Sequence, residues 1–162
     1  MYAIVAVSKN WGIGKDNALL FSIPEDMKQF RDSTMGKTII MGRNTLESFP
    51  NGAPLKNRRN ILISTQEDYM VEGVEVVNSP AQAVELTAEL PLDEVYVVGG
   101  SEVYRAMLPF CDKAFVTKVL KNAEADRFFP DLDSLPDWKL ASEGEIKEHE
   151  GIRYRFCVYE RV

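Results

Sequence analysis

Residues 94–102 read EVYVVGGSE: an apolar run, a pair of glycines and the start of a helical pattern that continues to residue 109. An uninterrupted apolar run bounded by turn residues is typical of a strand that is buried on both faces of a parallel sheet. Residues 38–48, TIIMGRNTLES, repeat the arrangement, with a strand expected over 38–41 and a helix over 44–48. Strands that alternate with helices in this way predict an α/β fold.

The same patterns extend outward along the chain. Further strands are expected over residues 3–7, 60–64, 74–77 and 114–120, and further helices over 24–34 and 80–90. Residues 139–145 and 152–160 read as a hairpin, because apolar and polar side chains alternate over 152–158. Residues 8–23 form a long segment that we expect to be irregular, yet its apolar side chains predict that it packs on the domain.

We therefore predict a single domain over residues 1–162. Its centre is a mostly parallel sheet of about eight strands with helices on both faces and an antiparallel C-terminal hairpin. A length of 162 residues with 45% hydrophobic and 27% charged residues suits one compact, ordered domain.

The overall charge argues against several classes of partner. The formal net charge is −6, which gives no general attraction to nucleic acid or to an anionic membrane surface. No apolar stretch is long enough for a membrane span and the N-terminus lacks a basic signal-peptide start, so we expect a cytoplasmic protein, and a monomer as the simpler state. One histidine and two distant cysteines predict buried free thiols and no metal site.

Both strand-to-helix turns have the chemistry of a phosphate site. Gly42 and the pair Gly99–Gly100 let the backbone approach a ligand, N–H groups are free at the start of each helix, and Arg43 adds a fork of donors. Glycines at such junctions are common for turn geometry alone, and neither turn matches the GxGxxG pattern. Two such turns in one small α/β domain together favour a nucleotide ligand.

Asp26 is the candidate catalytic residue. On a helix that begins at Pro24, Ile23, Asp26 and Phe30 lie three and four positions apart and share the face that packs inward, with Met27 beside them. Burial at the margin of an apolar face would raise the pKa of Asp26 and require a hydrogen-bond donor. The alternative is structural, since the helix dipole favours an acid in any first turn.

Several short motifs, in this order and spacing, resemble dihydrofolate reductase of the bacterial chromosomal type. They are IGKDN (13–17), IPEDMKQF (23–30), IMGRNTLES (40–48), NILIS (60–64), VGGSEVY (98–104), Thr117, Asp126 and FPD (129–131). The resemblance covers essentially the whole chain. It implies NADPH-dependent reduction of 7,8-dihydrofolate to 5,6,7,8-tetrahydrofolate in one-carbon metabolism, by hydride transfer to C6 and protonation of N5. It also implies binding of antifolate inhibitors.

The resemblance makes Asp26 the active-site carboxylate, which would accept hydrogen bonds from the ring N–H and the 2-amino group of the pterin. Thr117 would steady Asp26 and reach the 2-amino group through a water. The remaining residues implied to bind the substrate are Val5, Ala6, Phe21, Met27, Phe30, Leu55 and Arg58. Residue 58 matches the arginine for the glutamate α-carboxylate, and Arg59 stays an alternative because the preceding loop is longer than usual.

For the cofactor, the resemblance implies a mobile loop over residues 14–19 and a cis bond between Gly99 and Gly100. It also implies phosphate contacts from Arg43, Thr45, Thr65 and Gln66, with Arg43 facing the 2′-phosphate. The full set of implied cofactor residues is Ala6, Ile13, Gly14, Asn17, Ala18, Leu19, Gly42, Arg43, Asn44, Thr45, Ser64, Thr65, Gln66, Val98, Gly99, Gly100, Ser101, Glu102, Val103, Tyr104 and Asp126.

Two positions depart from the family pattern: Phe21 stands where a tryptophan is common, and Asn44 where a histidine is common. Three other functions fit the sequence less well. The reductase domain of riboflavin biosynthesis would not need Asp26 or an arginine in the folate-tail loop. A non-catalytic nucleotide-binding module would need no acid in its pocket. A flavodoxin-like signalling domain would carry an acidic cluster at the strand ends.

Overall fold

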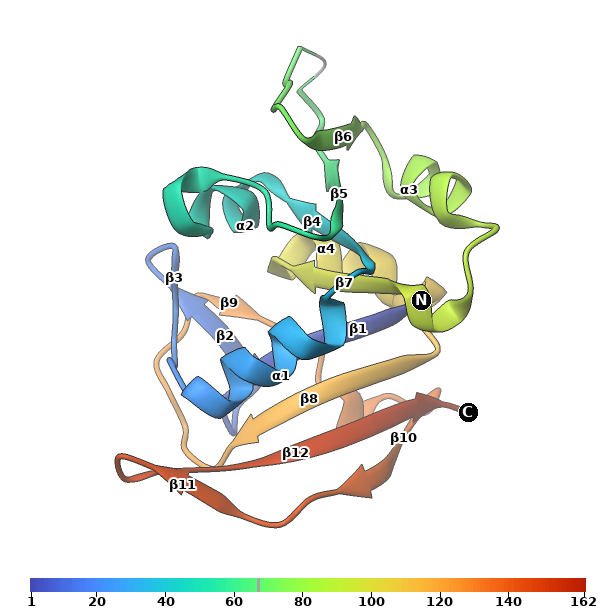
Figure 1. The fold of residues 1–162 in the computed structure, drawn as a ribbon. Helices are drawn as coiled ribbons and strands as arrows, with labels where there is room; N and C mark the ends of the chain where they lie inside the picture. The colour runs from blue at the N-terminus through green and yellow to red at the C-terminus, as the bar shows by residue number, and fades with distance from the viewer. Residues whose placement is uncertain (67) are drawn as a thin grey trace.

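The strand β7 (Val95–Gly99) is buried along its whole length, as its apolar sequence predicts. The structure is a computed structural model that describes residues 1–66 and 68–162. In it, β7 lies at the middle of the sheet, between β1 (Tyr2–Val7) and β4 (Thr38–Gly42), and it is parallel to both. No side of β7 faces solvent because strands flank its edges and helices cover its faces (Figure 1).

The main sheet has the order β10-β12-β8-β1-β7-β4-β5-β6. The strands not yet defined are β5 (Arg59–Ile63), β6 (Val74–Val77), β8 (Lys113–Val119), β10 (Trp138–Glu143), β11 (Lys147–His149) and β12 (Ile152–Arg161). Every pair from β8 to β6 is parallel, whereas β12 runs antiparallel to β8, β10 and β11. The mostly parallel sheet with an antiparallel C-terminal hairpin is therefore confirmed, with β11 as a short addition.

Alternate side chains of the strands enter two separate apolar layers. Ala3 and Val5 of β1 pack in one layer with Tyr104 and Met107 of the helix α4, whereas Ile4 packs in the other. The α-helices are α1 (Pro24–Thr34), α2 (Arg43–Ser48), α3 (Pro80–Thr87) and α4 (Ser101–Met107). Because α3 and α4 contribute to the first layer and α1 and α2 to the second, the prediction of helices on both faces is confirmed.

The described residues also contain four 3-10 helices: η1 (Pro50–Gly52), η2 (Leu92–Glu94), η3 (Leu108–Phe110) and η4 (Leu132–Ser134). The helix expected over 102–109 changes to 3-10 form after Met107, since Pro109 has no N–H for a continuing helical bond. Cys111 and Cys157 are buried free thiols, as predicted. None of the helices in the described residues is long and apolar enough to span a membrane.

Residues 8–23 are not irregular throughout, so that expectation was wrong. They contain β2 (Gly12–Lys15) and β3 (Ala18–Leu19), which join β9 (Arg127–Phe128) in a second, three-stranded sheet. Asp16 and Asn17 connect β2 and β3 with φ of 52° and 64°, the left-handed conformations that a two-residue hairpin turn requires. We call residues 12–19 the β2–β3 hairpin.

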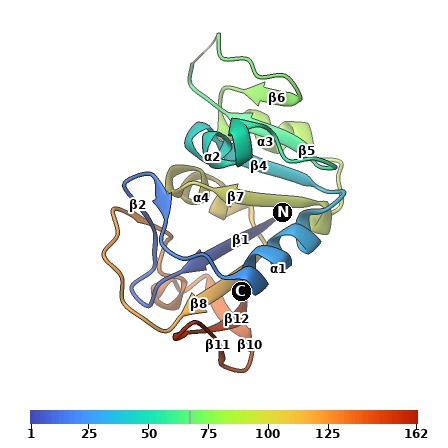
Figure 2. The ribbon, with the colours of Figure 1, turned by 60° about the vertical axis from the view of Figure 1, so that its left-hand side comes forward.

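The carboxyl ends of the central strands define where a ligand can bind. The adjacent strands β4 and β7 lead into α2 and α4, which lie on opposite faces of the sheet. An open α/β sheet binds ligands beyond the strand ends at such a switch point. The β2–β3 hairpin lies on the same side of the molecule as these strand ends, near α2 (Figures 1 and 2).

Candidate active site

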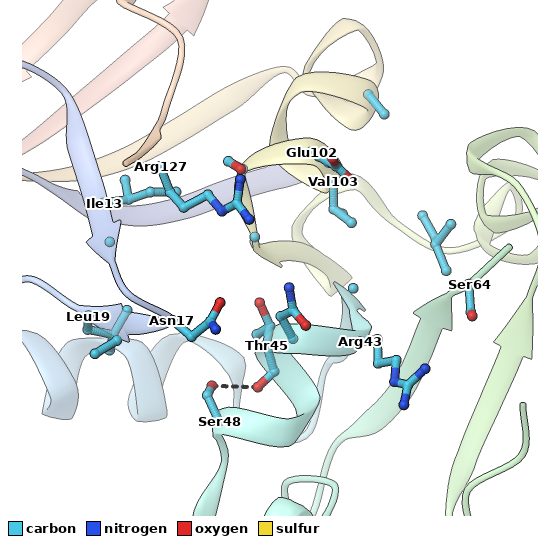
Figure 3. Close-up of a pocket in the computed structure, with 18 of the residues that line it drawn as sticks. Ile13, Asn17, Leu19, Arg43, Thr45, Ser48, Ser64, Glu102, Val103 and Arg127 are labelled. Atoms are coloured by element: carbon cyan, nitrogen blue, oxygen red, sulfur yellow. Dashed lines mark hydrogen bonds between the residues drawn. The ribbon is translucent and has the colours of Figure 1, made fainter. Parts of the chain in front are cut away.

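A cavity of about 530 Å³ lies at the switch point between the two predicted turns. Residues of the β2–β3 hairpin border one end of it, and Ser64, which follows β5, borders the other (Figure 3). Turn residues that follow β4 and β7 lie between these ends. The cavity is therefore elongated and crosses the ends of several strands, a shape that suits an extended dinucleotide.

The two glycine turns lie against each other. A Cβ atom on Gly42 would be 3.1 Å from Cγ2 of Val103, and one on Gly99 would be 3.3 Å from Oγ1 of Thr45. Gly99 also has φ of +117°, which side chains of L-residues rarely adopt, and its bond to Gly100 is cis, as the resemblance implies. Glycine is required here because each turn approaches the helix that follows the other.

Sixteen of the residues implied for the cofactor line this cavity: Ile13, Gly14, Asn17, Ala18, Leu19, Gly42, Arg43, Asn44, Thr45, Ser64, Thr65, Gln66, Gly100, Ser101, Glu102 and Val103. Five others do not: Ala6, Val98, Gly99, Tyr104 and Asp126. Six lining residues were not predicted: Lys15, Ser48, Ile63, Pro80, Ala106 and Arg127. Lys15, Ile63 and Arg127 each adjoin a predicted residue in the chain, and the β2–β9 pairing brings Arg127 to the cavity.

Arg43 provides the donors at the end of the cavity away from the β2–β3 hairpin, which we call the far end. Its Nε donates to Glu47 at 2.9 Å, an Nη donates to Gln66 at 2.9 Å, and its guanidinium lies 4.8 Å from the ring centroid of Tyr69. These contacts hold the planar fork beside Ser64 and Thr65, whose hydroxyl groups can also bind phosphate oxygens. The donor set therefore fits the phosphate groups of a nucleotide.

Asp126 does not line the cavity and instead contacts the β2–β3 hairpin. Its carboxylate accepts a hydrogen bond from the backbone N–H of Asp16 at 3.0 Å, and its own N–H donates to the carbonyl of Gly14 at 3.0 Å. Asp126 thus ties the β2–β3 hairpin to the segment that leads into β9.

Asp26 lies in the first turn of α1, and Thr117 of β8 donates a 2.6 Å hydrogen bond to its Oδ1. Thr117 is almost completely buried, and it is the register partner of Ala6 on β1. Burial raises the pKa of Asp26 above that of an ordinary aspartate, and the hydrogen bond from Thr117 partly opposes the rise. The predicted pairing of an apolar-margin acid with Thr117 is confirmed.

The side chains around Asp26 divide into buried and exposed ones. Ile23 is buried, Phe30 is half-buried, and Met27 is 58% exposed. Leu19, at the end of β3, is 83% exposed. The inward face predicted for α1 is thus formed by Ile23, Asp26 and Phe30, while Met27 presents apolar surface that a ligand can cover.

Three of the other residues implied for the substrate, Phe21, Phe30 and Leu55, belong to apolar clusters near α1. Phe30 and Leu55 pack against the same layer, on the face that carries α1 and α2. Phe21 packs with Ile23 and Tyr154 in a smaller cluster at the start of α1, and Val5 is buried in the layer on the opposite face.

Tyr104 joins β1 to the turn at Gly99. Its hydroxyl group donates to the carbonyl of Ile4 at 2.7 Å, and its ring lies next to Gly99. Burial raises the pKa of Tyr104, and the nearby negative charge of Asp26 adds to that rise. The phenol therefore stays neutral and serves as a fixed donor to the backbone of β1.

Arg58 and Arg59 differ in their partners. Arg59 pairs with Glu75 through two hydrogen bonds. The Nε of Arg58 donates to Thr34 at 2.9 Å, and no carboxylate pairs with Arg58 among the described residues. Burial, helped by the positive charge of Arg31, lowers the pKa of Arg58. An anionic ligand would relieve this repulsion at Arg58, whereas Arg59 already has its counter-charge.

A family model described as dihydrofolate reductase matches residues 1–161. The chain belongs to the dihydrofolate reductase family. It is 37% identical to the dihydrofolate reductase of Bacillus subtilis (strain 168), with 98% of this chain and 92% of the relative covered. It is 40% identical to that of Neisseria meningitidis serogroup B and 38% identical to that of Haemophilus influenzae, and each match covers 98% of this chain and 96% of the relative.

Family membership gives the site its chemical class. The chain is an oxidoreductase, and the enzymes of the dihydrofolate reductase family act on a small molecule with a nicotinamide cofactor. The elongated cavity between the glycine turns has the shape and the donors for such a cofactor. Asp26 is the partly buried acid in the first turn of α1, and its raised pKa suits a role in binding or proton chemistry.

Proposed function

We propose that this protein reduces 7,8-dihydrofolate to 5,6,7,8-tetrahydrofolate with NADPH, by hydride transfer to C6 and protonation of N5. The observation that carries the proposal is the Asp26–Thr117 pair, which places an acid of raised pKa at the sheet edge that also forms the dinucleotide-shaped cavity. Neither a nucleotide-binding module nor the riboflavin-type reductase accounts for that acid.

Asp26 anchors the substrate in this proposal. When ionised, its carboxylate accepts paired hydrogen bonds from the ring N–H and the 2-amino group of the pterin. Thr117 holds one carboxylate oxygen in place, so the acceptor geometry exists before the substrate arrives. The negative charge also favours the protonated form of the ring.

Apolar side chains and one arginine hold the rest of the substrate. Ala6, Phe21, Met27 and Phe30 surround the pterin, with Phe30 packed on its ring, and Val5 lines the pocket through its backbone. Leu55 packs on the aminobenzoyl group, and Arg58 binds the glutamate α-carboxylate. The absence of a carboxylate partner for Arg58 among the described residues supports this choice over Arg59.

NADPH, when bound, supplies the hydride. Arg43, Thr45, Thr65 and Gln66 bind its phosphates, with Arg43 at the 2′-phosphate, and the cavity-lining residues named above hold the rest. The support is the donor set at the far end of the cavity and the space that Gly42 and Gly99 leave for a ligand. Tyr104 fixes the backbone of β1 beside Gly99, on the nicotinamide side.

Water brings the proton to N5, because Asp26 binds the pterin too far along the ring to deliver it. The β2–β3 hairpin is the lid: it closes over nicotinamide and substrate and limits how much water enters. Asp126 supports the lid through Asp16 and Gly14 and does not touch the cofactor directly.

The test is to mix protein, NADPH and dihydrofolate and follow the absorbance of the reduced nicotinamide. We expect oxidation that needs both protein and dihydrofolate and that yields tetrahydrofolate. Folded protein that shows no oxidation above background would rule the proposal out. A cytoplasmic location, a monomeric state and binding of antifolate inhibitors stay predictions from the sequence.

A further inference from the structure

Arg127 is a cation of the cavity that the sequence did not predict. Its side chain reaches from β9 into the cavity, toward the start of α4 where Glu102 and Val103 lie (Figure 3). The residue is exposed, and no carboxylate or hydrogen-bond acceptor pairs with its guanidinium among the described residues. An arginine of this kind keeps all its donors free for a ligand.

The other cations of the cavity already have partners. Nζ of Lys15 lies 2.6 Å from Oε1 of Glu124, and Nε of Arg43 lies 2.9 Å from Oε1 of Glu47. Glu102, also in the lining, adds a carboxylate that would repel an anion. Of the cations that line the described part of the cavity, Arg127 alone has no carboxylate partner, so it is the one whose charge a bound anion would neutralise.

The position of Arg127 selects the part of the cofactor that it can reach. Arg43 and Ser64 lie at the end of the cavity away from the hairpin, whereas Arg127 lies on the hairpin side, across from Glu102 (Figure 3). A dinucleotide that extends from Arg43 toward the hairpin passes its central pyrophosphate between these places. The planar guanidinium fork matches phosphate oxygens in charge and geometry.

We propose that Arg127 binds the pyrophosphate of the dinucleotide cofactor and so ties the β2–β3 hairpin to the bound cofactor. The link to the hairpin follows from the strand register, since Arg127 is the partner of Gly14 on β2. Arg127 also follows Asp126, whose carboxylate accepts a hydrogen bond from the backbone N–H of Asp16. The inference rests on the proposed function, because it needs a pyrophosphate in this cavity.

The test is calorimetric titration of NADPH and of NADH into the intact protein, without turnover. The variants are Arg127→Gln, Arg127→Lys and, as a matched control, Arg105→Gln, which removes the same charge from the exposed side of α4 outside the cavity. NADH lacks the 2′-phosphate but keeps the pyrophosphate, so the two ligands separate the contacts.

We expect Arg127→Gln to raise the Kd of NADPH and of NADH by the same factor, about tenfold at low ionic strength. The factor should fall as salt is added. Arg127→Lys should recover part of the affinity, and Arg105→Gln should leave it unchanged. Amide hydrogen exchange over residues 12–19 should be slowed by NADPH in wild type and less so in Arg127→Gln.

An Arg127→Gln variant with wild-type affinity for both ligands would overturn the inference while leaving the proposed function intact. A loss confined to NADPH would also overturn it, because Arg127 would then contact the 2′-phosphate. A folded wild-type protein that binds neither ligand would instead overturn the proposed cofactor. Since Arg127 is exposed, its replacement should not unfold the domain, and circular dichroism of each variant checks this.

Discussion

Thr117 and Asp26 lie 91 positions apart in the chain, yet the Thr117 hydroxyl donates a 2.6 Å hydrogen bond to Oδ1 of Asp26. Two opposing effects therefore set the charge of this acid. Burial favours the neutral carboxyl group and raises its pKa, and the donor favours the carboxylate and lowers it, with burial the larger effect. The site keeps an acid that is both shielded from water and held in one orientation.

Thr117→Val removes the donor and keeps the shape of the side chain. The loss of a hydrogen bond to the ionised form should raise the pKa of Asp26 further, so the carboxyl group should titrate at higher pH than in wild type. NMR titration of the Asp26 carboxyl carbon measures this directly. Thr117→Ser, which keeps the hydroxyl group, should titrate close to wild type, and a lower titration midpoint in Thr117→Val would contradict the account.

Asp26→Asn should stabilise the folded protein at neutral pH. A carboxyl group whose pKa is raised by folding binds more protons in the native state, so its contribution to stability falls as pH rises. Asparagine removes the free-energy cost of burying the ionised carboxylate. The gain should be present at neutral pH and vanish below the pKa of the unfolded chain, about pH 4. Thermal unfolding of both proteins across this range tests the sign, and an equal or lower Tm of Asp26→Asn at pH 7 would count against a buried, ionised Asp26.

Arg58→Gln and Arg59→Gln should differ in their effect on dihydrofolate. Loss of a charge-assisted contact to the substrate carboxylate should raise the KM of Arg58→Gln about tenfold or more. Arg59→Gln should keep a KM near wild type, because Arg59 already pairs with Glu75. The difference should disappear with a dihydropterin substrate that lacks the glutamate, and a KM effect confined to Arg59→Gln would reverse the assignment.

Gly99→Ala should destabilise the fold more than Gly36→Ala. Both glycines have positive φ, +117° and +76°, but a Cβ on Gly99 would lie 3.2 Å from the Tyr104 ring and one on Gly36 would meet nothing within 4 Å. We expect a loss of about 1 kcal/mol in unfolding free energy for Gly36→Ala and about 2–3 kcal/mol for Gly99→Ala. Denaturant unfolding compares them, and equal losses would mean that the turn at Gly99 relaxes freely.

The sequence predicted the elements whose signals are local. Apolar runs mark β4 and β7, and the glycines after them mark the turns, because a strand that is buried on both faces needs apolar residues throughout. The sheet of β2, β3 and β9 was missed because β9 pairs with β2 from more than a hundred residues away. The β2–β3 hairpin within it is a local pairing. Asp16-Asn17 was the available signal, since these two residue types tolerate the left-handed turn conformation.

The site residues also divide into those that local sequence patterns predict and those that depend on contacts between distant segments. The helical spacing of Ile23, Asp26 and Phe30 predicted the buried acid, and the resemblance supplied Thr117, which only the register of β8 against β1 brings near. Arg127 could not be found from local sequence, because it enters the cavity through its pairing with Gly14. Contacts between distant segments depend on register, and periodicity alone does not encode register.

The central claim is that Asp26 anchors the pterin, and the turnover of Asp26→Asn tests it most directly. The matched control is Asp32→Asn, which removes a carboxylate from the exposed side of the same helix. At pH 7, Asp26→Asn should reduce dihydrofolate at least about a hundredfold more slowly than wild type. It should bind NADPH with unchanged affinity, and Asp32→Asn should match wild type in both. A folded Asp26→Asn variant that turns over at a rate near wild type would contradict the claim.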